Sequence, residues 1–518
     1  MRPTSDSAAS PDWNALGEQW WSHVRALAGE RMEGRETGSP GMVRAAEYVT
    51  EQFRAAGLRP SGTEGYLQPV EFRVAQVDQP SSTLELVRDG RSEAVTLGED
   101  AVLSVYSTTA EHAEADAVFV GYGLTIPEFQ HDDFAGVDVR GKIVVLVRGG
   151  PSTIPGPVRA HYQSPEERFR AVRRAGAVGA VLIVNPTVPE LPWSRLAEGF
   201  LLPRMELVDP GTDGPEAPPT IAVFNPDRAE KMFAGSGHTF REIVGLLGSE
   251  AALPRFPLAV RLRVHAAFER RRATCRNVVG LLPGSDPHLR NEYVVLSAHL
   301  DHLGTGGPGN GHPIYWGAMD NASGVASLLE VARAFHDSGI APKRSILFLA
   351  VTGEEKGLLG SQYFATHPSV TGTVVANVNL DMFLPLFPLK YVEVQGLLES
   401  TLGDEFRAVC APGGIVAHTE YEPDRVLFIR SDQYNFIKAG VPALTFSFGY
   451  LPGSAEETTT KTWLAERYHG PADRPDQPVD APAAAQFNEI IGTMALRVAN
   501  ADRRPEWNAD SFFRRFAR

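Results

Sequence analysis

The sequence predicts an α/β protein built on a mostly parallel central sheet that is covered by helices. Residues 253–518 alternate buried-strand runs with amphipathic helices, which is the pattern of a parallel sheet with helical crossovers. With 43% hydrophobic and 22% charged residues, the 518-residue chain is globular and long enough for more than one domain. Residues 108–252 are richer in Pro/Gly loops, which predicts a separate domain there.

The N-terminal part predicts a tail followed by helices and short strands. Residues 1–12 are rich in Ser, Ala and Pro, so we expect a flexible tail. From residue 13 to about 60 helices are expected, because apolar side chains recur at helical spacing in the second of them, at Val43, Ala46, Val49 and Phe53. Short alternating strands follow, and we assign 13–107 to the same domain as 253–518.

The middle block, 108–252, contains two buried-strand runs, GKIVVLVRGG and VGAVLIVNP. Between them PEERFRAVRRAGA has the periodicity of one amphipathic helix. No set of His, Asp and Glu side chains with ligand-like spacing converges in this block. We therefore interpret it as a non-catalytic lid or spacer.

The third block, 253–518, contains the strands YVVLSAHLD, SILFLAVTG and VVANVNLDMF. The first two are separated by the helix ASGVASLLEVARAFHDSG, which places apolar side chains on one face. A last helix is expected from Ala481 to about Asn500. Because sites in open α/β sheets form at the carboxyl ends of the strands, polar residues at these ends are the candidate functional residues.

Ligand-type side chains stand at the ends of these successive elements. Singly, each has an ordinary explanation, such as a helix N-cap for Asp320 or a solvated turn for Glu354 and Glu355. Buried carboxylates are costly, however, unless a metal or a proton-transfer role compensates. Two imidazoles and three carboxylates form a donor set that suits Zn²⁺, with Mn²⁺ or Co²⁺ as alternatives: His299, Asp320, Glu355, Asp381 and His469.

Two further carboxylates stand beside this set. Glu354 remains free to act as a base. Asp301 follows His299 by two residues, so on an extended chain the two share a face. Its carboxylate is then expected to hold the far ring nitrogen of His299.

Five segments, AHLDHLG, GAMDNASG, TGEEKGLLGS, NLDM and YHGPAD, resemble metallopeptidase family M28, the co-catalytic di-zinc aminopeptidases. The similarity covers about 290–475 and the N-terminal helical part. The middle block, with VGYGLTIPEF, DFAGVDVRGKIVVLVRG and AGAVGAVLIV, looks like the protease-associated (PA) domain that many of these enzymes insert into the catalytic fold. The resemblance implies a zinc exopeptidase fold interrupted by a smaller, β-rich PA domain at 108–252, with 253–518 as the metal-binding catalytic part.

The resemblance also implies a role for each ligand. His299 and Asp381 would bind one zinc ion, and Glu355 and His469 the other. Asp320 would bridge the two ions, and the peptide bond that follows it would be cis. No residue of the chain is assigned to substrate binding.

The implied reaction is the zinc-dependent removal of N-terminal residues from peptides. Two metal ions share a water and lower its pKa to about 7, which creates a bridging hydroxide at neutral pH. Glu354 would be the general base that accepts the proton and passes it to the leaving amine. Asp301 would orient the metal-bound imidazole of His299. The partners are therefore peptide substrates, with the oligomeric state left open.

The net charge and the hydropathy of the chain limit the kinds of partner and the compartments that the sequence predicts. The 49 Lys+Arg against 63 Asp+Glu give a net charge of −14, which argues against nucleic acid and anionic membranes as partners. No run approaches the roughly 18 apolar residues of a membrane span. The first residues show no signal peptide, so the chain as given predicts a cytoplasmic protein, or a periplasmic or secreted one if a signal was removed upstream.

Three alternatives remain at this point. A carboxypeptidase or dipeptidase on the same scaffold would need a cationic pocket, for which only the loop residues Arg425 and Arg430 suggest themselves. Glutaminyl cyclase, another relative of the fold, keeps a single zinc, and the full set of five ligands argues against it. An inactive, receptor-like binding protein is disfavoured because relatives of that kind lose ligands.

Overall fold

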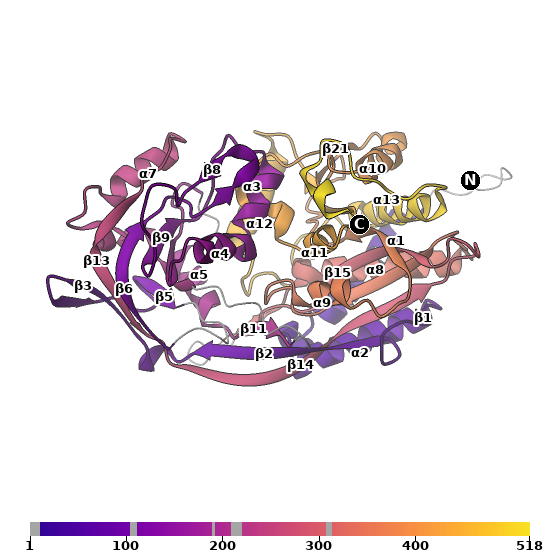
Figure 1. Ribbon diagram of the computed structural model, residues 1–518. Coiled ribbons are helices and arrows are strands. Elements are labelled where there is room, and N and C mark those ends of the chain that lie inside the picture. The colour runs from indigo at the N-terminus through magenta and orange to yellow at the C-terminus, as the bar shows by residue number, and fades with distance from the viewer. Residues whose placement is uncertain (1–10, 104–110, 189–191, 209–219, 307–312, 518) are drawn as a thin grey trace. The chain divides into compact units, whose positions relative to one another are not determined.

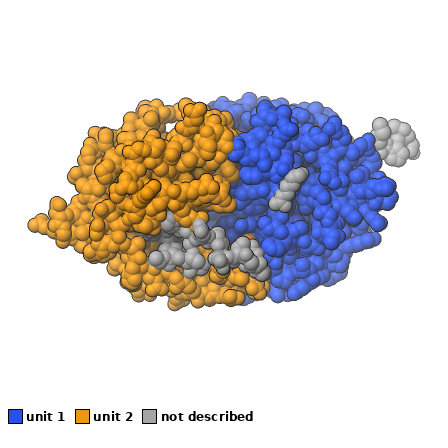
Figure 2. All heavy atoms as spheres, in the orientation of Figure 1, with its two compact units in different colours: residues 1–69, 275–421, 431–518 blue, residues 70–274, 422–430 orange. Residues whose placement is uncertain are grey.

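The structure is a computed structural model in which residues 11–103, 111–188, 192–208, 220–306 and 313–517 are described (Figure 1). Residues 1–10 of the expected tail lie outside this part. The chain divides into two compact units, shown in different colours in Figure 2. Unit 1 comprises Met1–Pro69, Cys275–Tyr421 and Ser431–Arg518, and unit 2 comprises Val70–Thr274 and Glu422–Arg430.

Unit 1 contains a sheet whose central strands are parallel. The strand order is β14 (Phe268–Leu282), β18 (Ser345–Val351), β15 (Glu292–His299), β19 (Thr373–Asn379), β22 (Ala443–Gly449), β20 (Tyr391–Gln395) and β21 (Val416–His418). Strands β18, β15, β19 and β22 are parallel, whereas β14 and β20 run antiparallel to their inner neighbours. Every residue of β18 is buried, as expected of a parallel strand covered on both faces. The predicted α/β class is confirmed.

The helices of unit 1 pack on this sheet and on one another. Helices α1 (Trp13–Leu27), α8 (Ser323–Asp337) and α13 (Ala481–Asn500) are in mutual contact, and α8 and α13 also contact β15 and β18. Helix α2 (Pro40–Ala55) packs on α8, α10 (Leu402–Cys410) on α13, and α11 (Gln433–Lys438) on α9 (Leu359–Thr366), β19 and β22. Helix α12 (Ala455–Glu466) precedes α13. Side-chain caps begin four of these helices, Asp12 at α1, Ser39 at α2, Ser454 at α12 and Asp480 at α13.

Unit 2 is built around a second sheet of mixed strands. Their order is β4 (Arg91–Ala94), β3 (Thr83–Arg88), β13 (Phe256–His265), β6 (His112–Phe119), β9 (Ile143–Val147), β10 (Gly179–Ile183), β12 (Thr220–Phe224) and β5 (Ala101–Leu103). The strands β6, β9, β10 and β12 are parallel to one another. A cluster of buried valines and alanines, with Leu146, packs around β9 and α4. The helices are α3 (Gly156–Gln163), α4 (Pro165–Arg174), α5 (Trp193–Leu201), α6 (Glu230–Phe233) and α7 (Phe240–Gly248).

The remaining described strands form further pairs. In unit 2, β7 (Thr125–Ile126) pairs with β8 (His131–Asp132), and β11 (Arg204–Leu207) pairs with β2 (Leu67–Val77). In unit 1, β16 (Gly304–Thr305) pairs with β17 (Ile314–Tyr315), and β1 (Arg59–Pro60) pairs with β14. Within the described residues no helix combines the length and the apolar character that a membrane span requires.

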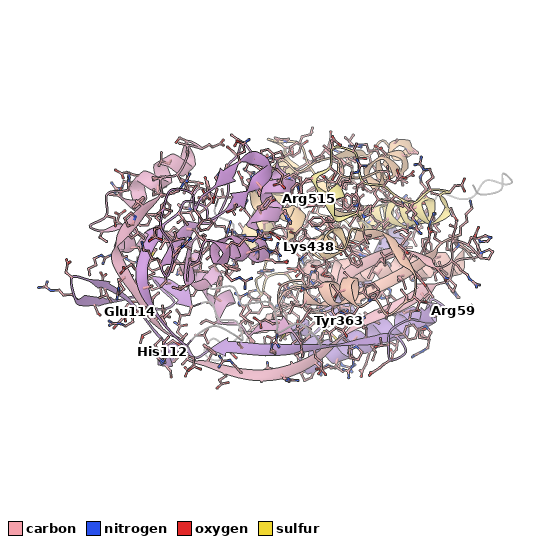
Figure 3. The ribbon with its side chains drawn as sticks, viewed as in Figure 1. Arg59, His112, Glu114, Tyr363, Lys438 and Arg515 are labelled. Carbon is pink, nitrogen blue, oxygen red and sulfur yellow. The ribbon has the colours of Figure 1, made fainter. Side chains whose placement is uncertain are left out.

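The exposed face of β6 and β13 carries ion pairs between neighbouring strands; Figure 3 labels two residues of β6, His112 and Glu114. Arg263 pairs with Glu114 at 2.8 Å and with Glu85 at 3.1 Å. Next along these strands, the rings of His112 and His265 stack with centroids 4.5 Å apart. Cross-strand pairs of this kind stabilise an antiparallel ladder, so these charges have a structural use in unit 2.

Unit 2 extends beyond the domain boundaries expected from the sequence. Residues 70–103 and 253–274, which we assigned to the other domain, belong to this unit, as do residues 422–430. The reason is hydrogen bonding, because β3 and β13 pair with each other and β13 pairs with β6 of the middle block. The insertion at 108–252 itself stays a prediction.

Candidate functional site

The candidate residues of unit 1 follow the carboxyl ends of its parallel strands. Strand β15 ends at His299, β18 is followed by Glu354 and Glu355, and β19 is followed by Asp381. Parallel strands present these ends at one edge of the sheet, which is why residues far apart in sequence meet. Two further segments supply the rest of the candidate set: Asp320 precedes α8, and His469 follows α12.

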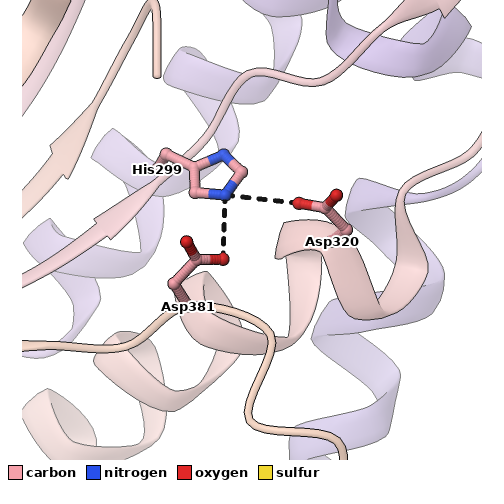
Figure 4. A group of neighbouring side chains, drawn as sticks. All are labelled: His299, Asp320 and Asp381. Carbon is pink, nitrogen blue, oxygen red and sulfur yellow. Dashed lines mark hydrogen bonds and ion pairs between the residues drawn. The ribbon is translucent and has the colours of Figure 1, made fainter. Parts of the chain in front are cut away.

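A first group of ligand-type atoms surrounds the imidazole of His299 (Figure 4). Its Nε2 lies 3.3 Å from Oδ1 of Asp320 and 3.1 Å from Oδ1 of Asp381. Its Nδ1 lies 3.1 Å from the backbone carbonyl oxygen of Asp301 and can donate a hydrogen bond to it. That bond would leave the Nε2 lone pair directed at the two carboxylates, which is the arrangement of a metal-binding histidine.

A second group shares Asp320 with the first. Oδ2 of Asp320 lies 3.3 Å from Nε2 of His469, and the same nitrogen lies 3.3 Å from Oε2 of Glu355. The other oxygen of Glu355, Oε1, lies 2.7 Å from Nδ1 of His302. Asp320 thus faces His299 with one oxygen and His469 with the other, so the structure brings all five candidate ligands together.

These two groups fit metal ions by spacing and chemistry. The ligand atoms of His299, Asp320 and Asp381 lie within 4.8 Å of one another, and so do those of His302, Asp320 and Glu355. Two ligand atoms on a tetrahedral zinc, each at ~2.0–2.2 Å from the ion, are roughly 3.3–3.6 Å apart. The contacts of His299 and His469 with the carboxylates are close to this range. Imidazole nitrogens and carboxylate oxygens are also the donors that zinc accepts.

Asp301 is placed differently from the sequence expectation. Its backbone carbonyl, and not its carboxylate, contacts the ring of His299. The buried carboxylate instead accepts hydrogen bonds from Oγ1 of Thr37 (2.7 Å) and from the backbone N–H groups of Glu354 (3.1 Å) and Glu355 (3.3 Å). The reason is that β15 ends at His299, so the two-residue alternation of a strand does not continue to Asp301.

The turn that carries Asp320 is held by a second buried carboxylate, that of Asp473. The Asp320–Asn321 peptide bond is cis, as the resemblance implied. Asp473 accepts hydrogen bonds from the backbone N–H groups of Met319 (2.9 Å) and Asp320 (3.0 Å) and from Nε2 of Gln477 (2.6 Å). Asp473 therefore connects the His469 segment with the Asp320 turn.

A fully buried arginine, Arg35, connects the same region from the N-terminal side. Its guanidinium donates to the backbone carbonyls of Leu27, Leu300, Trp316 and Gly317 at 2.7 to 2.9 Å. Burial lowers its pKa to about 10. Since Leu300 lies between His299 and Asp301, and Gly317 precedes the Asp320 turn, this one side chain holds two ligand-bearing loops.

Burial and neighbouring charges shift the pKa values of the carboxyl groups in the site in different directions. Burial raises the pKa of the Glu354 carboxyl well above its usual range, and nearby Asp381 and Glu355 add to this effect. Burial acts on Asp320 in the same way, but His302, His299 and His469 outweigh it and hold the pKa of Asp320 well below its usual range. Burial also raises the pKa of Asp432 to about 7.

Sequence reasoning missed four residues of this region: His302, Asp473, Arg35 and Asp432. His302 was visible in the segment HLDH, three residues after His299, and Asp473 in HGPAD, four residues after His469. Arg35 acts through backbone carbonyls, which no side-chain pattern reveals. Asp432 comes from the start of α11, a helix with no metal-ligand pattern of its own.

Comparison with known families agrees with this geometry. Residues 277–495 match peptidase family M28, and residues 104–226 match the PA domain. Among curated proteins, the chain is 27% identical over 503 residues to "Probable glutamate carboxypeptidase VP8" of Zea mays, covering 89% of this chain and 64% of that protein. It is 30% identical over 190 residues to "Leupeptin-inactivating enzyme 1" of Streptomyces exfoliatus, covering 36% of this chain and 38% of that protein.

One solved structure has a similar fold over nearly the whole chain. The "Aminopeptidase from Aneurinibacillus sp. strain AM-1" superimposes with a TM-score of 0.56 at 20% identity, covering 94% of this chain and 95% of that one. This similarity concerns the fold, and it confirms the zinc exopeptidase architecture expected for unit 1. The two domain matches identify residues 277–495 as a peptidase family M28 domain and residues 104–226 as a PA domain.

Proposed function

We propose that this protein is a zinc-dependent aminopeptidase that holds two metal ions and removes N-terminal residues from peptides. The observation that carries the proposal is the position of Asp320, whose two oxygens face His299 on one side and His469 on the other at 3.3 Å each. A carboxylate with one oxygen towards each ligand group could serve both ions of a two-metal site. His299 and Asp381 would hold one ion, and Glu355 and His469 the other.

The chain's own residues supply the proton chemistry. Bound zinc ions would act as Lewis acids and lower the pKa of water in the site. Peptide hydrolysis adds the oxygen of water to the carbonyl carbon, breaks the C–N bond and delivers a proton to the leaving amine. The Glu354 carboxylate would accept the proton from the attacking water and return it to that amine. Its backbone N–H, which donates to Asp301 at 3.1 Å, holds the residue at the end of β18.

The electrostatics favour a substrate with a free amine over one with a free carboxylate. Two cations near the ligands are already engaged, since Arg35 donates to four carbonyl oxygens and Lys356 pairs with Glu36 at 3.0 Å. Both are buried, and neither is available to bind a substrate carboxylate. Two bound zinc ions would balance the carboxylates of the site, so the engagement of Arg35 and Lys356 is what favours a substrate with a free amine.

The decisive variant is Glu354→Ala. Loss of a general base is expected to lower kcat by about 10²–10⁴-fold while both metal ions stay bound. Glu51→Ala is a matched control, because Glu51 is exposed on α2. Unchanged turnover in Glu354→Ala would contradict the proposed reaction.

The choice between amine and carboxylate is tested with paired substrates. Aminoacyl-p-nitroanilides should be hydrolysed, and N-blocked peptides with a free C-terminus should not, with a chelator abolishing the first reaction. The maize relative bears the name of a carboxypeptidase, so this comparison is needed. Faster hydrolysis of the N-blocked peptides would favour the carboxypeptidase alternative.

A further inference from the structure

His302 is a buried histidine at the candidate metal groups to which no role has been given so far. Its side chain is completely buried, and Nδ1 lies 2.7 Å from Oε1 of Glu355. The ring also faces Asp320, whose Oδ2 is 3.9 Å from the same nitrogen. A third imidazole beside two carboxylates could be a metal ligand or could hold a ligand in place, and the distances distinguish these two roles.

The contact between His302 and Glu355 has the length of a hydrogen bond. Charge-assisted N–H···O⁻ bonds are about 2.7–2.9 Å long, whereas two ligand atoms on one zinc lie roughly 3.3–3.6 Å apart. His302 is at 2.7 Å from Glu355, while His469 is at 3.3 Å from the same carboxylate. A carboxylate oxygen only accepts hydrogen bonds, so Nδ1 of His302 is the donor. Although His302 lies within reach of a metal group, its distance to Glu355 is that of a hydrogen bond, whereas the distance from His469 to Glu355 is close to that of two ligands on one ion.

The two oxygens of Glu355 therefore have different partners. Oε1 accepts from His302, and Oε2 faces His469. We propose that His302 is a positioning residue whose Nδ1–H occupies Oε1 of Glu355, so that Glu355 presents only Oε2 to the metal ion it would share with His469 and Asp320. This inference rests on the proposed function, because it concerns one of the two metal positions.

The surroundings of His302 are built for a fixed ring. Its backbone N–H donates to the carbonyl of Arg35 at 3.1 Å. At position 317 a Cβ atom would come within 2.6 Å of the His302 ring, so glycine makes room for the imidazole there. Gly317 also has a φ of +58°, which glycine adopts without strain. In this packing the ring cannot turn freely away from Glu355.

The hydrogen bond to one oxygen of Glu355 should affect which metal ion this position prefers. Zinc is satisfied by about four ligands, whereas Mn²⁺ suits oxygen-rich, octahedral sites. Occupation of Oε1 by His302 would leave Oε2 as the Glu355 oxygen available to a metal ion, which would favour an ion that needs few ligands. His302 should thus raise the affinity of this position for zinc and its preference for zinc over manganese.

The experiment measures metal binding to the full-length, metal-free protein by competition with a chromophoric chelator, for Zn²⁺ and Mn²⁺ separately. In His302→Ala we expect one of the two zinc equivalents to weaken by about 10–100-fold, as is usual when the hydrogen-bond partner of a ligand is removed. The ratio of zinc to manganese affinity should fall at the same position. In His302→Asn, whose amide nitrogen can take the place of Nδ1, zinc affinity should stay close to that of the unaltered protein.

Each other outcome has a definite meaning. Two zinc equivalents of unchanged affinity in His302→Ala would overturn the positioning role. Complete loss of one equivalent in both His302 variants would show that His302 is a ligand, which also contradicts the proposal. His336→Ala, at an exposed position of α8, is the matched control and should change neither affinity. If the unaltered protein does not bind two equivalents, the proposed function itself fails.

Discussion

The two ligand groups of unit 1 share Asp320 but hold their other ligands in different ways. At the first, the far nitrogen of His299 contacts a backbone carbonyl, and Asp381 is the more exposed carboxylate, with 17% of its side chain accessible. At the second, Glu355 is 4% exposed and has an imidazole at each oxygen. Each position thus combines one buried with one partly exposed side chain, His299 (1%) with Asp381 (17%) and Glu355 (4%) with His469 (27%), and the two positions differ in what contacts the buried side chain.

Removing a ligand from either group should have the largest effect. His299→Ala and His469→Ala are each expected to lose one metal equivalent and to lower peptidase activity by about 10²–10³-fold or more, because a metal supplies several kcal/mol of charge stabilisation and about 1.36 kcal/mol corresponds to a factor of ten. Metal content and kcat/KM of the two variants provide the measurement.

Two results for these variants would contradict the description of two separate metal positions. Retention of both metal equivalents by His299→Ala or by His469→Ala would show that the ligand is wrongly assigned. Loss of both equivalents from either variant would show that the two positions do not bind metal separately.

Asp473 should affect both groups, because it acts on the residue that they share. Its carboxylate accepts from the backbone N–H groups of Met319 and Asp320. In Asp473→Asn we expect both zinc affinities to fall by about 10–100-fold, in contrast to the single position affected by His302. Chelator competition on the metal-free protein tests this. A change confined to one equivalent would mean that Asp473 does not act through Asp320.

Substitution of Thr37 should lower activity less, because Thr37 contacts Glu354 only through Asp301. The Thr37 hydroxyl donates to Asp301 at 2.7 Å, and Asp301 in turn accepts from the backbone of Glu354 and Glu355. Thr37→Val removes one of three hydrogen bonds, so we expect a loss of about tenfold or less in kcat, from roughly 0.5–1.5 kcal/mol for one bond. Thr37→Ser, which keeps the hydroxyl, should restore activity. Equal losses in both variants would point to packing instead.

The smallest effect on the metal groups is expected from Glu330, which lies on α8 away from them. Burial acts to raise its pKa, but His23 and Arg333 outweigh burial and lower it below the ordinary 4.5. A lowered folded-state pKa means that Glu330 stabilises the fold above its ordinary pKa and that this contribution disappears as the pH falls through the lowered value.

The measurement is urea unfolding of the metal-free protein and of Glu330→Gln. The variant should be less stable by about 1.5–3 kcal/mol near neutral pH, the range for hydrogen bonds to charged groups, and the difference should shrink in acid. Zinc binding should be unaffected in both. A difference that grows as the pH falls would have the wrong sign and would refute the assigned ion pair.

Side chains that follow recognisable strands could be predicted from the sequence, whereas contacts made through the backbone could not. The candidate ligands His299, Glu355 and Asp381 were predictable because they stand at or just after the ends of strands whose apolar runs are easy to recognise, and parallel strands bring these ends together. The role of the Asp301 carboxylate was not, since β15 ends before it and the chain turns. Contacts with the backbone, such as those of Arg35, leave no mark on residue spacing.

The boundaries of the two units could not be predicted from local sequence patterns either. Pairing of β3 with β13 joins residues 83–88 to residues 256–265, a long-range contact that local patterns do not contain. The helix α4 and the strands β9 and β10, in contrast, were predicted from their own periodicity, because each is determined by residues close in sequence.

Zinc titration of the metal-free protein is the most direct test of the proposal that this chain is a two-zinc aminopeptidase. Bound zinc and the hydrolysis of an aminoacyl-p-nitroanilide are followed in the same samples. We expect binding to saturate at two ions per chain and hydrolysis to appear only as zinc is bound. Full hydrolysis in the presence of excess chelator, or saturation without any hydrolysis of the free-amine substrate, would contradict a two-zinc aminopeptidase.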